Sequence, residues 1–221
     1  AAQEESKPVE FTADLGLVNT SGNSSVTTLN VGEQIRVNGG PVVFSQFFKV
    51  VYGKSEGEVT TSAWNAGGRA DVKLSPSVSV FGLVAWNRNT FAGSARRFEE
   101  AAGLAVRAIR TPTIRLELEG GLSLIQPRSV DSLNNNFAAG RAAGLFRRTF
   151  SRRSWVQQAV QFFPNLKDGD DFRVNTETSL VAPLSDHVAL KASYVIRFDN
   201  QPEPGFEKTD RLLTTGVQVT F

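Results

Sequence analysis

The segment IRLELEGGLSL, residues 114–124, alternates apolar and polar residues along nearly its whole length. Successive side chains of a β-strand point to opposite faces of the sheet, so this alternation predicts a strand with two different faces. One face would carry the apolar residues Ile114, Leu116, Leu118, Leu122 and Leu124. The other face would carry the polar residues Arg115, Glu117, Glu119 and Ser123.

The same period of two continues along the rest of the chain, and it is almost as regular in VALKASYVIRFD, residues 188–199. No segment keeps a helical spacing of apolar residues for long, which predicts an all-β protein. Turn residues between the alternating segments place the strands at 9–18, 26–37, 42–53, 58–72, 77–88, 97–109, 113–125, 137–148, 154–163, 171–182, 187–199 and 209–221. An even number of strands is typical of bacterial barrels, because it returns both termini to one side of the membrane.

Hydropathy fits a membrane barrel better than a membrane helix. The chain has no uninterrupted apolar run of about 18 residues, which a transmembrane helix requires. Its mean hydropathy is −0.18, but a barrel strand shows lipid only every second residue, so a neutral average is expected. We therefore predict a closed, antiparallel, up-and-down transmembrane β-barrel of about twelve strands.

The connections between the predicted strands fall into two alternating classes, as expected for periplasmic turns and extracellular loops. The short class is 38–41, 74–77, 110–113, 149–154 and 183–187. The longer or more polar class is 19–25, 53–58, 89–97, 126–136, 164–171 and 199–209.

Aromatic residues lie near the predicted strand ends, where barrels place girdles at the two membrane interfaces. These residues are Phe11, Phe44, Tyr52, Trp86, Phe98, Phe146, Trp155, Phe163, Phe172, Phe198 and Phe221. Each could be a core aromatic by itself, and their collective placement is a further check on the membrane barrel.

Composition excludes several kinds of site. The chain has no cysteine and one histidine, His187, so thiolate and multi-histidine metal sites are excluded, and no metal or cofactor is predicted. The net charge is +2 and the basic residues are scattered, so nucleic acid is not predicted as a partner. The start AAQEESKPVE is typical of a chain from which a signal peptide has been removed. We therefore expect residues 1–8 to form a periplasmic tail and residues 9–221 to form one barrel in the bacterial outer membrane.

The last strand ends in TTGVQVTF, residues 214–221, which matches the assembly signal of outer-membrane barrels at Thr214, Gly216, Val219 and Phe221. The barrel-assembly machinery would recognise such a strand by pairing with its edge, and glycine permits close backbone approach. Outer-membrane lipid and lipopolysaccharide are the other expected partners, and an envelope protein is a further candidate.

The chain also resembles a bacterial family of salt-induced outer-membrane proteins whose function is unknown. The resemblance extends from about Phe11 to Phe221, through GLVNTSGNSS (16–25), NRNTFAGSARRFEEAAGLAVR (87–107) and the final segment 189–221. It implies an outer-membrane barrel and supplies no catalytic residues.

The polar faces of the predicted strands define a candidate lumen with interleaved charges. The principal lumen-lining candidates are Arg36, Lys49, Arg69, Arg107, Arg115, Glu117, Glu119, Arg141, Arg173, Glu177, Lys191 and Arg197, and the same faces carry Glu10, Asp14, Asp71, Arg97, Glu99, Arg147, Asp199 and Asp210. These charges would line a narrow, slightly anion-preferring channel, or pair with one another and plug the interior. Glu33 and Glu100 break the alternation, and we expect a bulge, an interfacial depth or an error in the assigned register at each.

Three functions follow from this barrel. A passive pore for small solutes or ions is one, and a structural barrel that docks onto another envelope component is another. The third, an outer-membrane phospholipase, needs a Ser/His pair near the extracellular end. His187 lies in a predicted periplasmic turn, so the sequence favours a non-enzymatic role.

Overall fold

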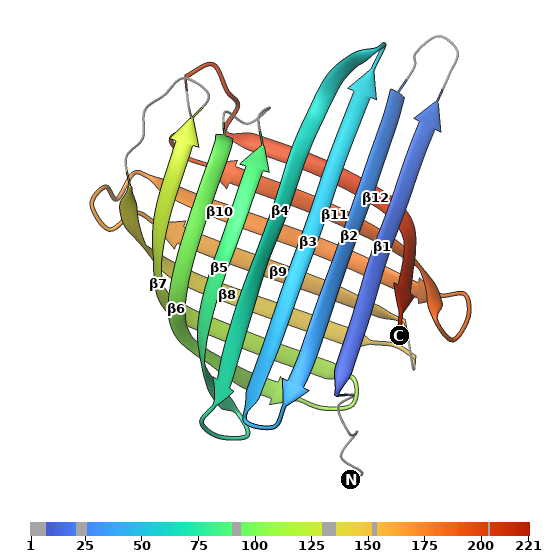
Figure 1. Ribbon diagram of the computed structural model, residues 1–221, viewed down its shortest axis with the longest axis vertical. Helices are drawn as coiled ribbons and strands as arrows, with labels where there is room; N and C mark the ends of the chain where they lie inside the picture. Colours follow the sequence, from blue (N-terminus) through green and yellow to red (C-terminus); the bar gives the residue numbers. More distant parts are fainter. Residues whose placement is uncertain (1–7, 21–25, 90–93, 130–135, 152–153, 203) are drawn as a thin grey trace.

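The computed structural model describes residues 8–20, 26–89, 94–129, 136–151, 154–202 and 204–221. They form one closed antiparallel barrel in which each strand pairs with its neighbour in sequence and β1 pairs with β12 (Figure 1). The strands are β1 (Val9–Thr20), β2 (Val26–Gly39), β3 (Val42–Ser55), β4 (Glu58–Lys73), β5 (Val78–Asn89), β6 (Ser94–Arg110), β7 (Ile114–Ser129), β8 (Phe137–Thr149), β9 (Trp155–Pro164), β10 (Phe172–Pro183), β11 (Val188–Asp199) and β12 (Thr209–Thr220). The predicted all-β barrel of about twelve strands is confirmed. No helix among the described residues is long and apolar enough to cross a membrane.

The two ends of the barrel differ in their connections. Strand β1 begins and β12 ends toward one end of the barrel, together with the turns after β2, β4, β6, β8 and β10, and we call this the turn end (Figure 1). The opposite end, with the remaining six connections, is the loop end. Of the expected periplasmic tail, residues 1–7 lie outside the described residues.

The longer connection predicted between the third and fourth strands is wrong. The polar segment 53–58 was predicted as a longer connection, but the structure places only Glu56 and Gly57 between β3 and β4. Both residues have positive φ, 53° and 87°. Two consecutive residues with positive φ form the type of turn that matches the twist of a hairpin, so a two-residue connection suffices here.

The barrel closes at a short seam between β1 and β12. The paired residues extend from Thr12 opposite Thr220 to Leu15 opposite Val217. Phe11 and Phe221 extend the seam by exchanging backbone hydrogen bonds of 3.3 and 3.0 Å. These bonds close the sheet, which leaves β1 and β12 joined at the turn end.

The wall has an apolar exterior and a polar interior. Leucine, valine and aromatic side chains such as Leu122, Leu213 and Trp86 are exposed on the outside. Trp155 and Phe163 were expected in the aromatic girdles, and this prediction is wrong, because both point into the barrel. There the Arg147 guanidinium lies 4.2 Å from the centre of the Trp155 ring, and Phe163 packs against Ile125 and Ala139.

The two glutamates that break the alternation remain on the outer face. The strand register is continuous through Glu33 and Glu100, so the bulge that was one of the expected explanations is absent at both. The Gln46 side chain donates a hydrogen bond of 2.6 Å to the Glu33 carboxylate. Glu100 lies between Val84 and Leu124, both exposed apolar residues.

Candidate functional site

The interior of the barrel is the candidate site, because most of the charged residues of the strands point into it. The structure places the twelve principal candidates at inward strand positions: Arg36, Lys49, Arg69, Arg107, Arg115, Glu117, Glu119, Arg141, Arg173, Glu177, Lys191 and Arg197. They do not form one cluster. Instead most of them belong to a central network, two further ion pairs, a turn-end group or a cavity at the loop end.

The central network begins at Arg69 on β4. Its guanidinium donates two hydrogen bonds to Asp71 on the same strand, at 2.7 and 2.8 Å. Its third bond, at 2.6 Å, goes to Glu119 on β7. Because β5 and β6 lie between these strands, this bond crosses the interior of the barrel and does not follow the wall.

Arg141 on β8 continues the network. Its guanidinium donates to Glu99 on β6 at 3.0 Å and lies 3.6 Å from Glu119. The side chains of Arg141 and Glu99 are only 4% and 8% exposed, and the Ser123 hydroxyl also donates to Glu99 at 2.9 Å. We define the central network as Arg69, Asp71, Glu99, Glu119 and Arg141. Opposite charges alternate along it, so each ion compensates its neighbours.

Two phenylalanines fill the space around these ions. The Arg69 guanidinium lies 4.3 Å from the centre of the Phe81 ring, and that of Arg141 lies 5.3 Å from the centre of Phe163. A cation over an aromatic face is attracted by the ring's quadrupole. Phe81 was not among the predicted interior residues. In the sequence, Phe81 is an even number of residues from Ser79 and Asn87, so it lies on the same face of β5 as these polar residues.

Two further ion pairs connect the walls on the other side of the barrel. Lys191 lies 2.6 Å from Asp14, which also accepts a hydrogen bond of 2.9 Å from Gln218. The Nζ of Lys49 on β3 lies 4.0 Å from the Oε2 of Glu177 on β10. Strands β3 and β10 are separated by four strands in the shorter direction around the barrel, so this contact also crosses the interior.

The turn-end group is more open. Arg115 lies 2.6 Å from Glu117 and Arg107 lies 3.7 Å from the same carboxylate. Arg115 is 38% exposed, so water screens this pair. Arg147 donates two hydrogen bonds to Gln157, at 2.9 and 2.7 Å.

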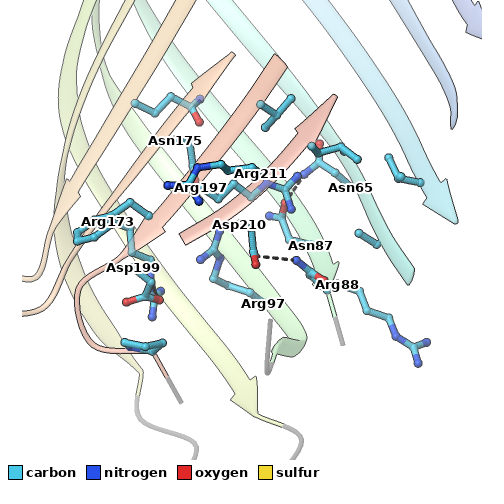
Figure 2. A pocket seen from close by; sticks show the side chains of 18 of the residues that line it. Asn65, Asn87, Arg88, Arg97, Arg173, Asn175, Arg197, Asp199, Asp210 and Arg211 are labelled. Carbon is cyan, nitrogen blue, oxygen red and sulfur yellow. Dashed lines mark hydrogen bonds and ion pairs between the residues drawn. The ribbon is translucent and has the colours of Figure 1, made fainter. Parts of the chain in front are cut away.

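A cavity of about 540 Å³ occupies the loop end of the interior (Figure 2). Lys49 and Glu177 are the lining residues of β3 and β10 that lie nearest to the turn end, so their contact marks its inner limit. Arg173 lies 2.6 Å from Asp199 on the adjacent strand, and Asn89 donates a 3.4 Å hydrogen bond across the barrel to Asp210. We call this space the loop-end cavity.

Three of the predicted assembly residues, Thr214, Gly216 and Val219, lie on β12, and Phe221 directly follows the strand. Thr214 is buried inside, with its hydroxyl 3.5 Å from the Ser193 carbonyl oxygen, while Val219 pairs with Ala13 and Val188. A Cβ on Gly216 would lie 2.2 Å from the Leu15 carbonyl oxygen, so only glycine fits there. Their part in assembly stays a prediction.

The C-terminal ring is held between two others on the outer surface. The Phe221 ring stacks on Phe11, with 6.4 Å between ring centres, and on His187, with 5.6 Å between ring centres. The His187 Nδ1 also lies 3.1 Å from the Thr220 carbonyl oxygen. The histidine therefore packs against the seam at the turn end, at the opposite end of the barrel from the loop-end cavity.

Comparison with known proteins finds a family and a relative that match most of the chain. A family model described as "Protein of unknown function, DUF481" matches residues 13–221. The chain is 23% identical over 212 residues to the "Uncharacterized protein YdiY" of Escherichia coli strain K12, a match that covers 96% of this chain and 82% of that protein.

Two solved structures share the fold. The translocator domain of autotransporter NalP from Neisseria meningitidis has a TM-score of 0.59 at 14% identity, covering 99% of this chain and 90% of that one. The NanC porin has a TM-score of 0.54 at 10% identity, covering 95% and 97%. The barrel is thus of the outer-membrane type.

Proposed function

Because the chain belongs to the DUF481 family and has the fold of outer-membrane barrels, we propose that it is an integral outer-membrane protein without enzymatic activity. Its interior is a narrow pore that ion pairs close almost completely at mid-height. Small ions would pass through it slowly. The observation that carries this proposal is the central network, in which Arg141 and Glu99 pair with almost no exposure to water.

The network supports a closed interior for an electrostatic reason. In a wide, hydrated pore each charged side chain would be solvated separately, and a contact between opposite walls would have little value. Here Arg69 reaches past two strands to Glu119, and Lys49 approaches Glu177 from the far wall. A solute that crosses mid-height would also have to separate Arg141 from Glu99, an ion pair that is poorly solvated because its side chains are only 4% and 8% exposed.

The orientation follows from the two ends of the barrel. Outer-membrane barrels have short turns on the periplasmic side and longer loops outside. We assign the turn end, where β1 begins and β12 ends, to the periplasm and the loop end to the cell exterior. The loop-end cavity would then open outward, above the closed mid-height section.

The position of the one histidine supports a non-enzymatic role. His187 is stacked on Phe221 at the turn end, and its Nδ1 faces a backbone carbonyl. A hydrolase of the kind considered above needs a histidine within about 3 Å of a serine nucleophile. The side-chain and backbone contacts of His187 place it in the seam instead.

Conductance in planar bilayers tests the proposal. We expect the wild-type barrel to give small or rare conductance steps, and Arg141→Ala or Glu177→Ala to increase them, because each removes one partner of a closing contact. Glu100→Gln changes a charge on the outer face and serves as the matched control. Large wild-type steps that Arg141→Ala and Glu177→Ala leave unchanged would contradict a closed interior. Silence of all variants, together with co-purification of an envelope protein, would favour the docking role.

A further inference from the structure

Three arginines from three strands meet in the loop-end cavity. They are Arg97 on β6, Arg173 on β10 and Arg197 on β11, and Figure 2 shows them around the same space. Arg97 has both like charges, Arg173 and Arg197, and opposite charges, Glu99 and Asp199, among its electrostatic neighbours. Like charges at close range repel each other, and such a cluster is costly unless an anion compensates it.

The acidic residues nearby leave donors of this cluster unused. Arg173 binds Asp199 through Nε, while its Nη1 is buried and has no hydrogen-bond partner among the described residues. Within the same part of the chain, no carboxylate lies within 4.0 Å of the side-chain nitrogens of Arg97 or Arg197. Glu99, the carboxylate two residues from Arg97, is already bound by Arg141 and Ser123.

The whole lining of the cavity also carries more positive than negative side chains. The described residues around the cavity include eight lysines and arginines but only four aspartates and glutamates. One of those four, Glu177, lies against Lys49, and another, Asp199, against Arg173. The volume of about 540 Å³ is within the range of small-molecule sites.

We propose that the loop-end cavity binds a small solute with two negative charges, carried by carboxylate or phosphate groups. Arg97 and Arg197 lie on strands separated by four others in the shorter direction around the barrel, so their donors approach a solute from facing walls. Guanidinium groups match the geometry of carboxylate and phosphate, with two parallel hydrogen bonds to each. Amide side chains of Asn87 and Asn175 line the same space and offer further donors.

This inference goes beyond the closed barrel proposed above. It depends on an accessible cavity at the loop end and not on conduction. If mid-height is closed, the cavity is a binding site that opens at one end. If mid-height is open, the same arginines become a binding site within a pore.

Titration calorimetry on the purified full-length barrel in detergent tests the site, with succinate and inorganic phosphate as probes at constant ionic strength. We expect saturable binding of at least one probe, and a loss of about tenfold or more in affinity for Arg97→Gln and for Arg197→Gln, because each removes charge-assisted hydrogen bonds. Succinate binding would indicate two separate acidic groups, and phosphate binding one doubly charged group. Arg148→Gln, on the outer face of β8, removes the same charge away from the cavity and should bind as the wild type does.

Equal affinity in the wild type and both cavity variants would overturn the proposal, as would an absence of binding of both probes above that of chloride. Circular dichroism and gel mobility identify a variant that has not folded, and Arg197→Lys then provides a milder change that keeps the charge but loses the paired hydrogen bonds. It should weaken binding less than Arg197→Gln does. Tight binding by a barrel that conducts freely would refute the closed interior and support this site.

Discussion

Arg141 donates a hydrogen bond to Glu99 at 3.0 Å in the middle of the barrel, and the two side chains are 4% and 8% exposed. The two residues lie on β8 and β6, with β7 between them. An ion pair this well buried is costly to break, because the remaining partner keeps its charge without compensation.

Arg141→Ala is therefore expected to lower the free energy of unfolding by about 3–5 kcal/mol. Arg115→Ala, which breaks a partly exposed pair with Glu117, is the control and should cost about 0–1 kcal/mol. Equilibrium unfolding in urea, with the barrel in lipid vesicles, measures both. Similar values for the two variants would show that water reaches the central network as freely as it reaches the turn end.

Gly216→Ala should impair closure of the barrel. The added Cβ would lie 2.2 Å from the Leu15 carbonyl oxygen and 2.7 Å from the Cα of Gly16, so the backbones of β1 and β12 would have to separate. Gly120→Ala is the matched control, because its Cβ would meet nothing within 4 Å. The yield of heat-modifiable barrel on unheated SDS gels measures closure. Equal yields for the two variants would mean that the seam tolerates the displacement.

Removal of Phe221 is expected to reduce the amount of assembled barrel in cells while synthesis and export continue. Its ring stacks on Phe11 and His187, and its backbone exchanges hydrogen bonds with Phe11. Phe150→Ala removes an exposed aromatic at a turn and serves as the control. Protease protection in isolated outer membranes measures assembly. Normal refolding in detergent combined with poor assembly in cells would assign the residue to recognition by the assembly machinery, and wild-type assembly would refute both roles.

Glu100→Leu should stabilise the barrel in lipid by about 1 kcal/mol, because a carboxylate on the lipid face is unfavourable at hydrocarbon depth. Glu100 lies on the outer face between Val84 and Leu124. Glu33→Leu should give a smaller gain, since it also removes the hydrogen bond from Gln46. Unfolding titrations in vesicles compare the two variants. No gain for Glu100→Leu would place this residue in the headgroup region.

The sequence by itself determined the strands and their two faces. The period of two in segments such as 114–124 and 188–199 is a local property of an extended chain, so it needs no tertiary information. It also determined that the barrel has an even number of strands and that Thr214, Gly216 and Val219 lie on the last of them, with Phe221 directly after it. Local composition failed at residues 53–58, where polar residues suggested a loop and the backbone of Glu56 and Gly57 forms a tight turn.

Only the tertiary structure decided which interior groups meet. Lys49 and Glu177 are far apart in sequence, and their contact depends on how many strands close the barrel and how far each is tilted and staggered. The same closure turned Trp155 and Phe163 inward and gathered Arg97, Arg173 and Arg197 in one cavity. Alternation assigns a side chain to a face, whereas the distance across the barrel is set by the whole sheet, and for that reason pairing between walls could not be predicted from the sequence.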